Sequence, residues 1–198
     1  MEQKFIIIGM DDNPEPFFPP EVITCIRQGK IFSGGMRHKE KVKKLLPENN
    51  EWISITVPLE YVFRQYEKVF TETGETIIVF ASGDPLFFGF ANTVKREFTN
   101  AKIRLYPTFN SLQILAHRLV LSYDDMRTVS LTGRPWQEFD RALMERVPKI
   151  GILTDRKHTP ATIAARMLEY GYDYYIMYVG EHLGNGEKER IRLSLIHI

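Results

Sequence analysis

The segment best suited to chemistry is a short turn that follows a buried-strand pattern. The apolar run Ile77–Ala81 is followed by Gly83, Asp84 and Pro85, and a helical pattern starts at Leu86. In open parallel sheets, ligands bind at the carboxyl ends of the strands, where such turns lie. Gly83 permits close approach of a ligand, Asp84 offers an acceptor or a helix cap, and Pro85 suits the first helical turn. The pattern predicts a ligand-binding turn, although a capped strand-to-helix connection explains it equally well.

Two further turns have the same strand-turn-helix form. Thr108 and Ser111 lie where the strand pattern Lys102–Tyr106 gives way to a helix. Their hydroxyls and the free N–H groups of a helix start suit a polar ligand, although Ser111 is also a good plain N-cap. Leu153 and Thr154 end a later strand pattern in the same way.

Small and basic residues after another strand pattern suit an acidic ligand. Gly34 and Gly35 precede Arg37 and His38, and arginine binds a carboxylate through a planar two-donor fork. Gly9 also follows a strand pattern, but a lone glycine is a weak nucleotide-binding signal. The neighbouring lysines are typical of a solvated helix face: Lys41, Lys43 and Lys44.

No residue pattern indicates covalent or metal chemistry. The single cysteine, Cys25, lies in a predicted amphipathic helix, where a structural thiol is expected. The five histidines lack the spacing of zinc ligands, so we expect no metal site. Asp11 and Asp12 are explained as turn aspartates.

Alternating strand and helix patterns position these residues. Short β-branched runs between amphipathic stretches are typical of a parallel sheet covered by helices, so the fold class is α/β. We expect strands at Lys4–Ile8, Lys30–Ser33, Trp52–Thr56, Thr76–Ala81, Lys102–Tyr106, Thr128–Leu131, Ile150–Thr154, Tyr174–Val179 and Arg190–Leu195, with helices at Pro20–Gln28, Arg37–Leu46, Glu60–Thr71, Leu86–Phe98, Ser111–Leu121, Trp136–Arg146 and Pro160–Tyr170. A polar interruption at 122–126 predicts two small α/β domains, residues 1–122 and 126–198. Because the run Ile191–Ile198 has no closing turn, we expect the second domain to continue further.

The composition excludes some partners. The 198 residues include 26 Lys or Arg and 25 Asp or Glu, and a net charge of +1 provides no general field for nucleic acid or an anionic membrane. An anionic partner must therefore be held by a few placed residues. One cysteine allows no intrachain disulfide, and no apolar run is long enough to span a membrane, so we expect a cytoplasmic protein.

The order of three motifs resembles the tetrapyrrole methylase family. Gly83-Asp84-Pro85 is followed by Pro107-Thr108-Phe109-Asn110-Ser111 and then by Leu131-Thr132-Gly133-Arg134-Pro135. The likeness runs from Lys4 to about Ile191. Within the family, the segments 33–38 and 130–135 most resemble the branch that methylates carbon-5 of precorrins in cobalamin biosynthesis. The first loop departs from the family's glycine-rich pattern, because it reads Gly9-Met10-Asp11-Asp12-Asn13-Pro14.

The resemblance implies two α/β domains with a ligand cleft between them and S-adenosylmethionine (SAM) as the methyl donor. On this sequence, SAM would meet Gly83, Asp84, Pro85, Thr108, Ser111, Gly133, Leu153 and Thr154. The anionic tetrapyrrole would lie against Gly9, Gly34, Arg37 and His38. Since SAM carries an activated methyl group, the protein mainly aligns and shields the reactants, which fits the lack of an evident nucleophile. The reaction also implies loss of a proton from the macrocycle, for which Asp84 and His38 are the candidate catalytic residues.

The expected function is SAM-dependent methylation of cobalt-precorrin-7, or its cobalt-free analogue, at carbon-5. Alternatives are another methylase of this fold, acting on uroporphyrinogen, a diphthine precursor or ribosomal RNA, and a nucleotide-binding module without catalysis. The near-neutral charge argues against RNA. The resemblance also implies a homodimer, with a carbon-15 methyltransferase/decarboxylase as a fused or separate partner module.

Overall fold

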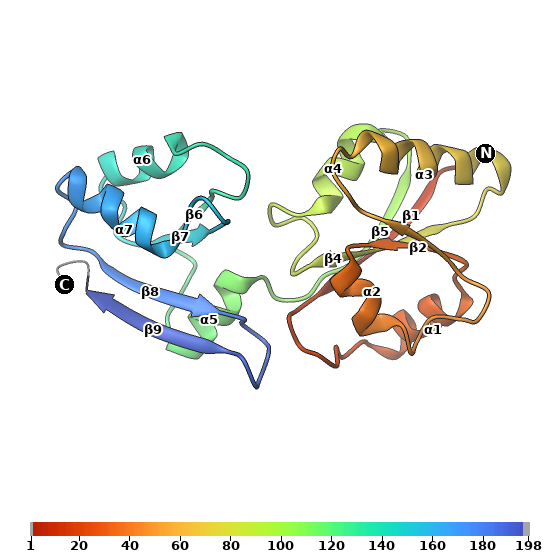
Figure 1. Ribbon diagram of the computed structural model, residues 1–198, viewed down its shortest axis with the longest axis horizontal. Coiled ribbons are helices and arrows are strands. Elements are labelled where there is room, and N and C mark those ends of the chain that lie inside the picture. Colours follow the sequence, from red (N-terminus) through yellow and green to blue (C-terminus); the bar gives the residue numbers. More distant parts are fainter. Residues whose placement is uncertain (1, 196–198) are drawn as a thin grey trace. The chain divides into compact units, whose positions relative to one another are not determined.

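The computed structural model describes residues 2–195, which form two compact units (Figure 1). Unit 1 is Met1–Asn110 and unit 2 is Ser111–Ile198. The division predicted from the polar interruption at 122–126 lies one helix further along the chain than the division between Asn110 and Ser111. Part of the predicted terminal run 191–198 lies outside the described residues, including His197.

Unit 1 is built on a five-stranded parallel sheet with the strand order β3-β2-β4-β1-β5. Its strands are β1 (Lys4–Met10), β2 (Ile31–Gly34), β3 (Glu51–Ser54), β4 (Ile77–Ser82) and β5 (Lys102–Tyr106). Its helices are α1 (Pro20–Gln28), α2 (Met36–Val42), α3 (Glu60–Glu72) and α4 (Phe90–Glu97). Because all strands run parallel, their carboxyl ends meet at one edge of the sheet.

Strand β4 shows why this sheet is covered on both faces. Ile77 and Val79 pack in one core with α3 and α4, while Ile78 and Phe80 pack in the opposite core with α1 and α2. All four side chains are buried, and successive strand residues face opposite sides. This is the pattern of a central strand in a parallel α/β sheet, and Figure 1 shows the helix pairs on opposite faces.

Unit 2 contains two small sheets within its described residues. The strands β6 (Arg127–Ser130) and β7 (Ile150–Leu153) pair in parallel, and β8 (Ile176–Glu181) and β9 (Arg190–Leu195) pair antiparallel. The helices are α5 (Ser111–Leu119), α6 (Gln137–Met144) and α7 (Pro160–Glu169). Phe139 of α6 and Ile163 of α7 are buried with Leu131 in one apolar core, so this unit is also α/β.

Helix α5 belongs to unit 2 because its apolar face packs on the strands of that unit. A Cβ atom on Gly151 would lie 2.8 Å from Cδ1 of Leu112, and one on Gly180 would lie 3.1 Å from Cδ1 of Leu115. Arg118 on the same helix pairs with Glu189 at 2.6 Å. These contacts place the division between the units before this helix rather than after it.

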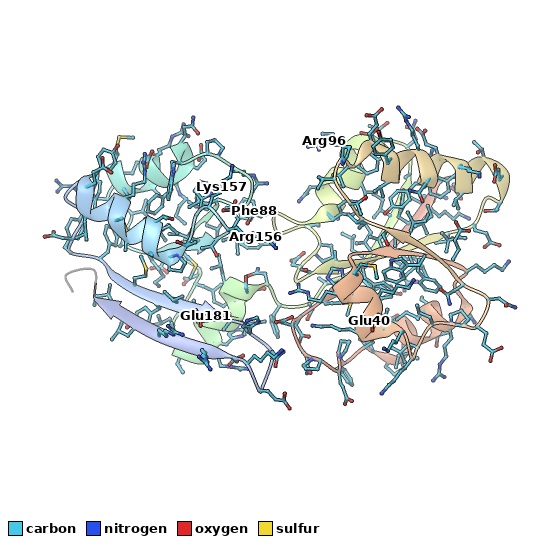
Figure 2. All side chains as sticks on the ribbon, in the orientation of Figure 1. Glu40, Phe88, Arg96, Arg156, Lys157 and Glu181 are labelled. Atoms are coloured by element: carbon cyan, nitrogen blue, oxygen red, sulfur yellow. The ribbon has the colours of Figure 1, made fainter. Side chains whose placement is uncertain are left out.

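Helix α4 begins later than the sequence predicts. Its pattern predicted a start at Leu86, but Phe88 has a φ of 53° and the helix starts at Phe90. Phe88, labelled in Figure 2, interrupts the helix because a left-handed residue cannot continue it. Pro85 therefore lies in a turn rather than in the first turn of the helix.

Candidate functional site

The carboxyl edge of the unit 1 sheet gathers three of the predicted ligand-binding turns. They follow β1, β4 and β5, which are neighbours in the sheet. A Cβ atom on Gly9 would lie 2.2 Å from the carbonyl oxygen of Gly83 and 2.9 Å from the backbone nitrogen of Thr108. The Gly83 N–H donates to the carbonyl of Met10 over 2.7 Å. The three turns are therefore in direct contact, and packing against backbone accounts for a glycine at position 9.

The turn after β4 is shaped by its own backbone. Gly83 has a φ of 61°, a left-handed conformation that glycine adopts without strain. Asp84 Oδ1 accepts the N–H of Leu86 at 2.8 Å, so this carboxylate caps its own turn. The cap position of helix α4 is instead Gly89, and the predicted use of Asp84 as that helix's cap is wrong.

The turn after β5 joins the two units. Thr108 contributes the backbone nitrogen that lies close to Gly9. Ser111 is the first residue of α5, so the cap position is Asn110, which is only 8% exposed. The predicted N-cap role of Ser111 is therefore wrong by one position.

Arg37 and His38 both reach the hydroxyl of Ser82 at the end of β4. Arg37 Nη2 lies 3.2 Å from Ser82 Oγ, and His38 Nε2 lies 3.1 Å from it. Both residues are in the first turn of α2, which follows β2, the neighbour of β4 in the sheet. Gly34 is closely packed here, because a Cβ atom would lie 3.1 Å from the ring of Trp52 and would require this ring to shift.

The imidazole of His38 is neutral near pH 7. Burial, with added repulsion from Arg37 and Lys41, lowers the pKa of His38 to about 4. Its Nδ1 is buried and has no hydrogen-bond partner among the described residues. The ring therefore acts as a hydrogen-bonding group and not as a positive charge.

Lys41 does not lie on a solvated helix face as predicted. Its side chain is 12% exposed, and Nζ donates to Asp12 Oδ1 at 3.0 Å and to the carbonyl of Asp11 at 3.2 Å. Arg37 Nη1 lies 3.4 Å from the same Asp12 oxygen. By contrast, Lys43 is 61% exposed, as a surface lysine should be. The basic residues of α2 thus hold the first loop against the sheet edge.

Two loops of unit 2 are joined at the ends of β6 and β7. Leu131 N–H donates to the carbonyl of Leu153 at 2.8 Å, and Thr132 Oγ1 donates to the carbonyl of Thr154 at 3.1 Å. One residue further along, the N–H of Gly133 donates to Asp155 at 2.8 Å. The structure therefore brings together all three cofactor residues predicted in this part of the chain: Gly133, Leu153 and Thr154.

Asp155 is the anchor of these two loops. Its carboxylate accepts backbone N–H groups from Gly133, His158 and Lys157, as well as the ring Nδ1 of His158. The hydrogen bond from Gly133, followed by that from His158, holds the pKa of Asp155 well below its usual range. The carboxylate is consequently ionised and held by these donors.

A cavity of about 1240 Å³ lies within unit 2. Its walls are largely apolar and include Leu112, Ile152 and Met177, whereas Ser111 and Thr154 add hydroxyl groups. Small-molecule sites have this composition, an apolar lining with a few polar groups, and volumes of roughly 300–1,000 Å³. The cavity is larger than this range, and its lining suits a partly apolar ligand such as a nucleoside.

Solved structures show the same arrangement of elements. A uroporphyrin-III C-methyltransferase from Thermus thermophilus, complexed with S-adenosylhomocysteine, covers 98% of this chain and 88% of its own at 17% identity, with a TM-score of 0.72. The chain has the tetrapyrrole methylase fold. The fold class that the sequence predicted is therefore confirmed.

Curated relatives of this tetrapyrrole methylase-like chain support the resemblance at the sequence level. A precorrin-6Y C(5,15)-methyltransferase (decarboxylating) from Sinorhizobium is 30% identical over 96% of this chain, and the chain spans about half, 46%, of its length. A cobalt-precorrin-7 C(5)-methyltransferase from Salmonella typhimurium is 26% identical over 93% of this chain and 87% of its own. No family model matches the chain.

Three residues that organise this tetrapyrrole methylase fold were missed by sequence reasoning. Ser82 stands directly before the Gly-Asp-Pro motif, and a hydroxyl at a strand end was the available signal. Asp155 follows a strand in the same way, and aspartate commonly accepts N–H groups in such turns. Lys41 gave no local signal, because its partner Asp12 is 29 positions away.

The possible metal ligands of residues 2–195 are not clustered. No group of three or more His, Cys, Asp or Glu side chains there is arranged to hold a metal ion. Cys25 lies in α1, with Sγ 3.8 Å from the hydroxyl of Tyr106. None of the described helices has the length and apolar character needed to cross a membrane.

Proposed function

We propose that this protein is a SAM-dependent methyltransferase acting at carbon-5 of cobalt-precorrin-7, or of its cobalt-free counterpart, in cobalamin biosynthesis. The observation that carries this proposal is that the chain matches two relatives with different names over different shares of their lengths. One is named for carbon-5 and carbon-15 and is matched over 46% of its length, whereas the other is named for carbon-5 alone and is matched over 87%. The segment that resembles both relatives therefore favours the carbon-5 reaction.

The residues present fit SAM as the methyl donor. The unit 2 cavity combines apolar walls with hydroxyls, which suits a nucleoside. When bound, SAM supplies a methyl group activated by its sulfonium sulfur. The proposed SAM-binding residues are Gly83, Asp84, Pro85 and Thr108 of unit 1, and Ser111, Gly133, Leu153 and Thr154 of unit 2.

The acceptor side of the proposal rests on the unit 1 sheet edge. A tetrapyrrole carries acetate and propionate groups, and the Arg37 guanidinium is 62% exposed and can donate to a carboxylate. Gly9, Gly34 and His38 complete the proposed surface. These residues contribute by orienting the acceptor and excluding water, since the methyl donor carries its own activation.

Asp84 and His38 are the two candidates for removing a proton from the macrocycle. A ring with a pKa of about 4 is a weak proton acceptor near pH 7, so His38 is better suited to hydrogen bonding. Asp84 uses Oδ1 to accept the Leu86 N–H and lies in the proposed SAM turn. We therefore give His38 a binding role, and Asp84 stays a candidate for proton removal only through its place in this turn.

Incubation with SAM labelled in the methyl group tests the proposal. The purified protein is offered cobalt-precorrin-7, its cobalt-free analogue, uroporphyrinogen III and ribosomal RNA in parallel. Label should appear in the carbon-5 methyl of the corrinoid. Transfer only to uroporphyrinogen or RNA, or binding of SAM with transfer to no acceptor, would overturn the assignment.

The Asp84→Ala variant tests the proposed SAM turn. Loss of the carboxylate releases the Leu86 N–H and loosens the turn, so we expect the Kd for SAM to rise about tenfold. Asp125→Ala is the matched control, because Asp125 is an exposed aspartate that pairs with Lys149. Equal SAM affinity in both variants would mean that SAM binds elsewhere.

A homodimer, a cytoplasmic location and a carbon-15 partner module remain parts of this proposal. The proposed methyl transfer to the tetrapyrrole depends on none of these three features. Sedimentation of the purified protein would measure the first directly.

A further inference from the structure

Ser82 is the point where two segments of the unit 1 edge meet. It is the last residue of β4 and is exposed, and it directly precedes the Gly83 turn. Arg37 Nη2 and His38 Nε2 approach its hydroxyl oxygen at 3.2 Å and 3.1 Å. Ser82 therefore connects the proposed acceptor-binding helix to the proposed SAM-binding turn.

The hydrogens of this cluster can be assigned from the donors available. Arginine only donates, so Ser82 Oγ accepts from Arg37. His38 has a buried Nδ1 without a partner among the described residues, and buried N–H groups without a partner are rare. The neutral ring therefore carries its hydrogen on Nε2 and donates it to Ser82. With its oxygen accepting from both neighbours, Ser82 has its own O–H left to donate.

The exposed part of Arg37 lies beside this O–H. Its side chain is 62% exposed, and one of its nitrogens lies 3.4 Å from Asp12 Oδ1, an oxygen shared with the nearly buried Lys41. A single carboxylate oxygen thus serves two cations. The positive charge of Arg37 is only partly compensated, which favours an anion at this position.

We propose that Ser82 and Arg37 together bind one carboxylate group of a ligand. The serine donates its O–H to one carboxylate oxygen, and the guanidinium donates an N–H to the other. This inference deepens the proposed function and rests on it, because that function supplies two carboxylate-bearing ligands. They are the side chains of the tetrapyrrole and the methionine part of SAM.

The Ser82→Ala variant tests this pair. A hydrogen bond to a charged group contributes enough that its loss should weaken the ligand about tenfold to a hundredfold. Ser82→Thr keeps the hydroxyl and should restore most of the affinity. Ser54→Ala is the matched control, because Ser54 ends β3 at the same sheet edge and its hydroxyl lies 3.6 Å from the sulfur of Met36.

Three measurements separate the two sources of the carboxylate. Titration calorimetry gives the Kd for SAM, steady-state kinetics gives KM for the corrinoid, and fluorescence quenching gives the Kd for coproporphyrin III, a propionate-bearing probe that needs no methyl transfer. A weaker SAM Kd alone assigns the carboxylate to the methionine part. A higher corrinoid KM or a weaker coproporphyrin Kd, with SAM unchanged, assigns it to the tetrapyrrole.

Equal values for Ser82→Ala, Ser54→Ala and the wild type in all three measurements would overturn the inference. A loss in Ser82→Ala that Ser82→Thr does not restore would also overturn it, because the hydroxyl would then not be the binding group. In the double variant of Ser82→Ala with Arg37→Lys, the combined loss should be smaller than the sum of the single losses. If the wild type binds coproporphyrin but methylates no corrinoid, the proposed function fails while the Ser82 comparison still decides this inference.

Discussion

A single methyl group on Gly9 should disrupt the unit 1 site. In Gly9→Ala, the new Cβ would lie 2.2 Å from the carbonyl oxygen of Gly83 and 2.9 Å from the backbone nitrogen of Thr108. Real Cβ atoms essentially never approach closer than 3.0 Å, so the two backbone segments have to separate by about 0.8 Å. Both neighbours are backbone atoms, so no side-chain rotation can relieve the contact.

The expected size of the effect follows from this displacement. Overpacking a closely packed site costs about 1–3 kcal/mol of stability. The displacement also strains the 2.7 Å hydrogen bond from Gly83 to Met10, and such bonds contribute about 0.5–1.5 kcal/mol. A shift of roughly 1 Å in a positioning loop can lower a rate on the order of a hundredfold. We therefore expect a less stable unit 1 and about a hundredfold lower kcat/KM.

Urea unfolding and methyl transfer from labelled SAM measure the two effects. Gly186→Ala is the control, because a Cβ there meets no atom within 4 Å. Gly9→Ala should lose both stability and activity, whereas Gly186→Ala should keep both. Wild-type stability together with wild-type kcat/KM in Gly9→Ala would refute the close approach of the first loop and the Gly83 turn.

Two other perturbations have distinct outcomes. Tyr66 donates its hydroxyl hydrogen to Ser33 Oγ at 2.6 Å, and Ser33 donates to the carbonyl of Ile53. Ser33→Ala leaves the buried Tyr66 hydroxyl without an acceptor and should lower the free energy of unfolding in urea by about 1–3 kcal/mol. Tyr66→Phe should cost less, roughly 1 kcal/mol. The reverse order would contradict this assignment of hydrogens. The Gly133 N–H is the first cause of the lowered pKa of Asp155 in the folded protein. The ionised carboxylate therefore stabilises the fold at pH values above its unfolded pKa of about 4, and this stabilisation is lost as the pH falls toward the lower pKa of the folded state. Acid unfolding of Asp155→Asn should therefore show a weaker pH dependence than that of the wild type, and identical profiles would argue against the carboxylate anchor.

The elements with clear periodicity and clear breakers were predictable from the sequence. Helix α1 and strand β5 match their predicted ranges residue for residue, at Pro20–Gln28 and Lys102–Tyr106. Proline at the start of α1 and β-branched or aromatic residues in the strands are local signals. The alternation of such segments was enough to predict the parallel α/β arrangement of unit 1.

The features that depend on distant partners were not predictable in this way. The late start of α4 reflects the left-handed conformation of Phe88, which an apolar helical pattern does not reveal. Helix α5 was assigned to the first domain because the polar interruption follows it, whereas its packing on Gly151 and Gly180 decides its place. Periodicity describes one face of an element, but only the fold determines which face finds which partner.

The charge at the unit 1 edge, rather than the net charge of the chain, determines what that edge can hold. Asp12 Oδ1 lies 3.0 Å from Lys41 Nζ and 3.4 Å from Arg37 Nη1, but Lys41 is 12% exposed and Arg37 is 62% exposed. A nearly buried cation is costly without a partner, so Asp12 acts mainly to compensate Lys41. Arg37 keeps its charge toward solvent, where it acts within about a Debye length of 8–10 Å. Removing Asp12 would leave Lys41 without its carboxylate partner and would add positive charge to the site.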